Sequence, residues 1–96
     1  MMQRYLVEVP HDPNPAACVR VIRIFLNTGS HYLARADWGC KDGQHSAWMI
    51  VEAASSDEAR QIVPPPLRGQ ARVVQLNQFT VDDLDSMVRE HDPSAP

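Results

Sequence analysis

The sequence predicts an α+β domain with the element order βαββαβ, a four-stranded antiparallel sheet and an extra C-terminal helix. Two observations carry this prediction. Segments in which apolar residues alternate, as in strands, take turns with segments of helical periodicity. In the middle of the chain, the Asp42-Gly43 pair joins two strand-like segments in the manner of a tight hairpin. With right-handed crossovers this order gives a split βαβ, ferredoxin-like domain with the strands arranged 4-1-3-2.

The first strand and the first helix are marked by local signals. Residues 3–9 place Tyr5, Val7 and Val9 on one face, which is the period of a strand. Asn14 is a good N-cap residue, so a helix is expected from Pro15 to about residue 27. The apolar arc of this helix is wider than packing on one sheet requires, so another helix or a second subunit is expected to cover part of it. Cys18, inside the helix, is interpreted as a small core residue.

The two middle strands are predicted at residues 32–40 and 45–53. A two-residue type I′ turn at Asp42-Gly43 sets their register and places Cys40 opposite His45. The same register pairs Trp38 with Ala47 on a face that helices are expected to cover. Trp48 falls on the opposite, open face.

The last third of the chain contains two more helices and one strand. Ser55 and Glu58 form a capping box for a short helix that ends before three prolines, and residues 71–79 are predicted as the fourth strand. Thr80 caps a final helix over 81–91, with Leu84, Met87 and Val88 expected on its buried side. Residues 1–91 are therefore predicted as one domain, and residues 92–96 as a disordered tail.

Composition narrows the class of function. The formal net charge is −3, with nine basic and twelve acidic residues, so no basic stripe favours nucleic acid. No apolar run approaches the ~18 residues that a membrane span needs, so no membrane partner is expected. The two cysteines do not make a disulfide framework, and no secretory segment opens the chain, so we expect a cytoplasmic protein with reduced thiols.

A metal site is the first functional hypothesis. Directly opposed Cys40 and His45 would have Cβ atoms about 4.5–5.5 Å apart, which suits two ligands of Zn²⁺ or Ni²⁺. The end of the first strand meets the same edge, so His11 is expected as a third ligand and Asp12 as a fourth. Two alternatives stay open, namely a thiol activated by histidine and simple packing beneath Trp38.

The open sheet face is the basis of a second hypothesis. It combines apolar residues with charges, and a second copy of the chain is expected to cover it, which makes the protein a homodimer. A cleft between the two sheets would be lined by Trp48, Asp37, Arg35 and Glu52. Such a cleft would hold a small-molecule ligand.

The opening RYLVEV, the one-domain length and the element order resemble small bacterial proteins of the dimeric α+β-barrel kind over residues 3–80. One branch of that group binds nickel, which implies imidazole ligands near a sheet edge. Other branches are monooxygenase-like or are isomerases such as muconolactone isomerase. The resemblance implies a dimeric barrel, and fold alone assigns no activity.

Two functions therefore compete. The first is a homodimeric domain that binds a small ligand or a transition-metal ion at the hairpin edge. The alternative is a small cofactor-free enzyme, monooxygenase-like or isomerase-like, that uses the inter-sheet cleft with Asp37 or Glu52 as a general base. The sequence leaves open whether the protein is an enzyme.

Overall fold

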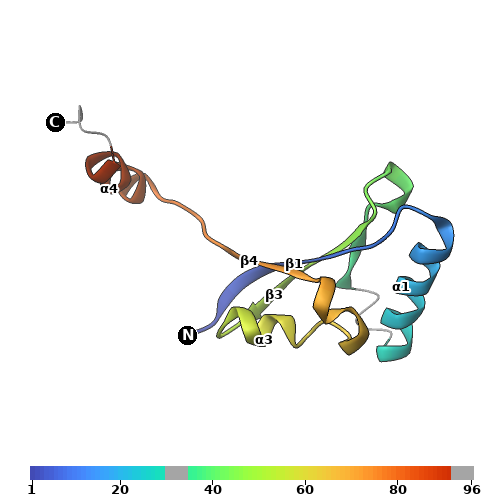
Figure 1. The fold of residues 1–96 in the computed structure, drawn as a ribbon. Helices are drawn as coiled ribbons and strands as arrows, with labels where there is room; N and C mark the ends of the chain where they lie inside the picture. Colours follow the sequence, from blue (N-terminus) through green and yellow to red (C-terminus); the bar gives the residue numbers. More distant parts are fainter. Residues whose placement is uncertain (30–34, 92–96) are drawn as a thin grey trace.

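The computed structural model describes residues 1–29 and 35–91, and it has the α+β architecture with a four-stranded antiparallel sheet that the sequence predicts (Figure 1). Strands and helices alternate along the first half of the chain, and two short 3-10 helices lie in the connections. The elements are β1 (Gln3–Pro10), α1 (Pro15–Thr28), β2 (Asp37–Trp38), η1 (Cys40–Asp42), β3 (Ser46–Ala53), α3 (Ser56–Arg60), η2 (Pro65–Gln70), β4 (Arg72–Leu76) and α4 (Val81–His91).

Strand β1 lies at the centre of the sheet. Read from one edge, the order is β4-β1-β3-β2, and every neighbouring pair is antiparallel. Along β1, residues 5, 7 and 9 are buried and alternate with residues that are not, which is the period expected of a strand covered on one face. The register pairs Val7 with Met49 of β3 and with Val73 of β4, so apolar residues of three strands share the covered face.

Helices α1 and α3 cover that face (Figure 1). Helix α1 begins where the sequence indicates, because the side-chain oxygen of Asn14 accepts a hydrogen bond of 2.7 Å from the amide of Ala17. It buries Val21 and Phe25 against the sheet. Helix α3 begins at the capping residue Ser55, as predicted. The core thus lies in one layer between the helices and the sheet.

The second strand is far shorter than predicted. Only Asp37 and Trp38 pair with β3, so the expected pairing of residues 35 and 36 with β3 does not form, and the part of the predicted strand over 32–34 lies outside the described residues. Strand β4 is also shorter than the predicted 71–79. It starts after η2, where the Ala71 amide bonds the carbonyl of Arg68, and it ends opposite Arg4, close to the beginning of β1.

The prediction that the last helix buries one side is wrong. Leu84, Met87 and Val88 of α4 are 56%, 41% and 41% exposed. Helix α4 lies away from the body of the domain, at the end of an extended stretch over residues 77–80 (Figure 1). The helix has the apolar side that the sequence predicts, but none of its residues is buried against another described part of the chain. The predicted tail over 92–96 lies outside the described residues.

None of the helices within the described ranges has both the length and the apolar character needed to cross a membrane.

Replacing Phe25 by Ala is expected to lower the free energy of unfolding by about 3–5 kcal/mol, because its fully buried ring leaves a cavity beside Trp38. The ring centroids of the two residues lie 5.3 Å apart with their planes nearly perpendicular, so an aromatic contact is lost as well. Leu26, the next residue, is half exposed, and Leu26→Ala is the matched control. Urea denaturation compares the two variants, and equal losses of stability would contradict this assignment of the core.

Acid is expected to unravel the first turn of α4. The Thr80 amide and hydroxyl hold the pKa of Asp83 below its ordinary value of 3.8, because the amide donates a 2.9 Å bond to the carboxylate. A lowered folded-state pKa means that the carboxylate stabilises this turn above pH 3.8 and stops doing so as the pH falls through the folded pKa. NMR of the α4 amides between pH 6 and 2 measures this, with Asp83→Asn expected to abolish the transition and Asp85→Asn expected to keep it.

Candidate metal centre

The connection between β2 and β3 is longer than the predicted two-residue turn. Residues 40–42 form the 3-10 helix η1, and Gly43 follows it in the left-handed region with φ 81°. The amides of Asp42 and Gln44 both donate to the carbonyl of Gly39, at 2.9 and 3.0 Å. The prediction that Cys40 and His45 face each other across a ladder is therefore wrong, because the ladder stops at Trp38–Ala47.

Gly39 explains why the turn takes this form. A Cβ atom at this position would lie 2.6 Å from a ring carbon of Trp48 and 2.7 Å from the carbonyl oxygen of Gln44. Only glycine allows the indole and the returning backbone to approach so closely. The chain thus folds tightly at Gly39, and the following residue, Cys40, is directed toward α1 and the end of β1.

Three potential metal ligands converge beside this turn. One nitrogen or sulfur atom from each of His11, Cys18 and Cys40 lies within 4.8 Å of the others. The closest pair is the Nε2 atom of His11 and the Sγ atom of Cys40, at 3.1 Å. All three residues are half buried. Both cysteines are free thiols.

Each of the three comes from a different element. His11 follows β1, and its amide donates a 3.0 Å bond to the carbonyl of His45, which extends the β1–β3 pairing by one residue. Cys18 lies in the first turn of α1, where its amide bonds the carbonyl of the capping residue Asn14. Cys40 begins η1. A strand end, a helix start and a turn therefore bring the group together.

The spacing of the group fits a tetrahedral ion. At Zn–N and Zn–S bond lengths of about 2.0–2.3 Å, a tetrahedral ion holds its ligand atoms about 3.5–3.8 Å apart. The observed distances bracket this value, since the pair of His11 and Cys40 is at 3.1 Å and the whole group falls within 4.8 Å.

The surroundings of Cys40 disfavour its thiolate form in the absence of an ion. Burial, and next the neighbouring Cys18 thiol, raise the pKa of Cys40 from 9.0 to about 11. The Cys40 thiol is thus protonated at pH 7. A bound cation must displace this proton, because the ligand form of cysteine is the thiolate.

His45 and Asp12, which the sequence also suggests as ligands, occupy different positions. The ring of His45 is next to the group, with its centroid 6.0 Å from that of His11. The Nδ1 atoms of both histidines are buried and have no hydrogen-bond partner among the residues that the structure describes. Asp12 is exposed and lies outside the group. Cys18 is the ligand candidate that the sequence analysis missed, since its helical pattern indicated only a core residue.

Two hollows adjoin the three ligand candidates. Cys18 and Cys40 line one of about 470 Å³, together with Ile22 and the ring of Trp38. His11 lines another of about 250 Å³. An ion held by the group would therefore have an open side, which distinguishes it from a closed structural site with four protein ligands.

Of the residues expected to line a cleft, Trp48, Asp37 and Glu52 lie on the open face of the sheet, and Arg35 lies outside the sheet. Asp37, Arg35 and Glu52 are exposed, and Arg35 precedes β2 instead of lying in the sheet. Trp48 is on the open face, as the register predicts, and its indole N–H donates a 2.9 Å bond to the Glu8 carboxylate. Glu8 in turn pairs with Arg72 at 2.9 Å.

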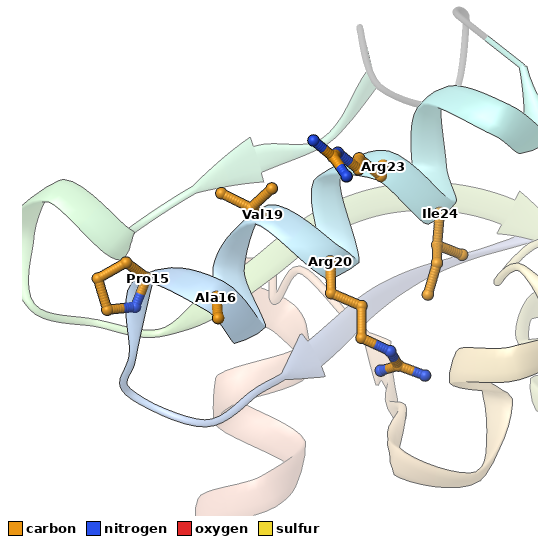
Figure 2. Close-up of a pocket in the computed structure, with 6 residues that line it drawn as sticks. All are labelled: Pro15, Ala16, Val19, Arg20, Arg23 and Ile24. Carbon is orange, nitrogen blue, oxygen red and sulfur yellow. The ribbon is translucent and has the colours of Figure 1, made fainter.

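A further hollow, of about 580 Å³, lies along the outer side of α1 (Figure 2). Val19 and Ile24 line it together with Arg20 and Arg23. The two guanidinium groups extend toward opposite sides of the helix in Figure 2, so they do not converge on one anion. This hollow is a groove on the helix surface, without polar side chains that converge on one ligand.

Comparison with known proteins found no match for this chain among protein-family models, among curated proteins or among solved structures.

Replacing Gly39 by Ala is expected to lower the free energy of unfolding by about 1–3 kcal/mol, because the added methyl group must displace backbone at Gln44 and the indole of Trp48. Gly69→Ala is the matched control, since a Cβ atom there meets nothing within 4 Å. Thermal unfolding of both variants provides the measurement. A Gly39→Ala variant as stable as Gly69→Ala would show that the turn does not need the close approach.

Proposed function

We propose that this protein binds one transition-metal ion, Zn²⁺ or Ni²⁺, through His11, Cys18 and Cys40. The observation that supports the proposal is the gathering of one imidazole and two thiols within 4.8 Å. These donors are separated by 7 and 22 residues along the chain, so they come together only through the fold. Imidazole and thiolate together favour zinc and related ions over magnesium or calcium.

The surroundings of the group support a site with one exchangeable position. Three protein ligands leave the fourth place of a tetrahedral ion to a water or a small molecule, and the hollow that Cys18 and Cys40 line adjoins the group. His45 is the alternative fourth ligand, because its unpartnered Nδ1 atom is buried next to the group. Reduced thiols are required in either case, in keeping with the cytoplasmic location expected from the sequence.

We also propose that the domain is ferredoxin-like and forms a homodimer. The order β4-β1-β3-β2, with helices on one face, supports a ferredoxin-like domain. The second, open face supports a homodimer of the α+β-barrel kind, in which another copy covers the exposed Ile50 and Val74.

No specific observation favours the alternative of a cofactor-free enzyme. Its candidate bases, Asp37 and Glu52, are both exposed in the single chain. The indole of Trp48 is held by Glu8. That alternative stays a prediction from the sequence.

Metal binding is tested on the full chain, purified without a histidine tag and under reducing conditions. We expect one equivalent of zinc by elemental analysis. After exchange for Co²⁺, a sulfur-to-cobalt charge-transfer band in the near ultraviolet should report thiolate ligands. Cys18→Ser, Cys40→Ser and His11→Ala are each expected to weaken zinc binding at least tenfold, since even residues that only support a ligand cost that much.

Two further variants sharpen the result. His91→Ala removes an exposed imidazole on α4 and is the matched control, with unchanged affinity expected. His45→Ala decides the fourth position, because a loss of affinity and a changed cobalt spectrum identify it as a ligand. Circular dichroism confirms that each variant is folded. A folded wild-type protein that takes up neither Zn²⁺, Ni²⁺ nor Co²⁺ would end the proposal.

A further inference from the structure

The open sheet face, defined by the outward residues of β1, β3 and β4, is apolar at its centre. Ile50 and Val74 are each 53% exposed there, and Leu6 lies between them in the register. Helices α1 and α3 pack on the opposite face, through the core residues that alternate with these. Within the described ranges, no helix packs on the open sheet face.

Helix α4 also has an apolar side that is exposed. Val81, Leu84 and Val88 repeat at helical spacing and form one apolar stripe, and they are 75%, 56% and 41% exposed. Residues 77–80 are extended and carry the helix beyond the end of β4 (Figure 1). The radius of gyration is 17.4 Å, compared with about 12–13 Å for a compact domain of this length. One chain therefore presents an uncovered sheet face and an uncovered helix in two separate places.

We propose that α4 of each copy lies across the open sheet face of a second copy, in a reciprocal dimer. This inference rests on the homodimer of the proposed function, but it replaces the direct sheet-to-sheet contact of an α+β barrel with a helix-to-sheet contact, and it uses none of the three ligand candidates. A twofold dimer of this kind uses both surfaces of both chains and leaves neither exposed.

The dimensions of the two surfaces match. Eleven residues of helix measure about 16 Å at 1.5 Å per residue. Four strands about 4.8 Å apart span about 14 Å between the outer two. One α4 helix therefore reaches across the whole sheet.

The open sheet face carries both signs of charge. Arg4 and Arg72 lie there with Glu8, Glu52 and Asp37, and Glu8 is paired with Arg72 at 2.9 Å. Arg4 is opposite Glu52 in the register, is exposed, and forms no ion pair with any residue that the structure describes. Residues 81–91 carry four acidic side chains against one arginine, so Arg4 is the position at which a docked α4 would gain an ion pair.

The test uses two double variants of the full chain, in sizing chromatography with light scattering. Leu84→Asp with Val88→Asp damages only the helix, and Ile50→Asp with Val74→Asp damages only the open sheet face. The wild type is expected to be a dimer and each double variant a monomer. An equimolar mixture of the two should regain dimer at high protein concentration, because one of its two contacts pairs an intact helix with an intact sheet.

The matched control is Leu26→Asp, a half-exposed apolar residue on α1, which should remain dimeric. Circular dichroism and zinc binding, measured on every variant, separate loss of the dimer from loss of fold or of the metal site. A dimer that survives Leu84→Asp with Val88→Asp would show direct sheet-to-sheet contact and overturn the inference. A monomeric wild type, or a mixture that stays monomeric, would overturn it too, since α4 would then lie free or on its own sheet.

Discussion

The pairing of β1 with β3 is the constraint on which the other features of this structure depend. It runs in register from Gln3 opposite Ala53 to Pro10 opposite Ser46, and the amide of His11 extends it to the carbonyl of His45. Because side chains alternate along a strand, this single register decides which residues face α1 and α3 and which form the open sheet face. It also fixes where β1 ends, and therefore where the imidazole of His11 lies. A shift by one residue would exchange the two faces and remove His11 from the thiols.

The ligand candidates depend on a second, smaller constraint at the turn. Once β3 is in place, the chain before it must pass beneath the indole of Trp48, and Gly39 permits this. The tight 3-10 turn that follows directs Cys40 toward α1, where Cys18 lies in the first turn of the helix. Two buried nitrogens without partners lie beside these thiols, and each such atom costs about 1–3 kcal/mol. A bound ion would offset this cost at His45 if its Nδ1 atom were the fourth ligand, but not at His11, whose Nε2 atom is the one beside Cys40.

Features that rest on local bonds could be predicted from the sequence, and those that rest on distant neighbours could not. The helix starts at Asn14 and Ser55 follow from a side chain that bonds an amide three residues away, so their signal is complete within a few residues. The Asp42-Gly43 pair correctly marks a positive φ at Gly43 but does not say how many residues the turn contains. That number depends on Trp48, which is nine residues from Gly39. Cys18 follows the apolar pattern of α1, and nothing within the helix signals a thiol from another element. For α4 the pattern predicts an apolar side but not the surface that it meets.

Trp48 contacts both the turn that carries Cys40 and a residue of the open sheet face. One edge of its ring lies against Gly39 and supports the turn that carries Cys40, while its N–H is bonded to Glu8 on the open sheet face. A helix docked on that face would bury the indole further and restrict its motion. The turn beneath it would then be held more firmly, because Gly39 has the ring as its nearest neighbour. Trp48 is therefore the side chain that connects the open sheet face to the turn before β3, although none of the three ligand candidates lies on that face.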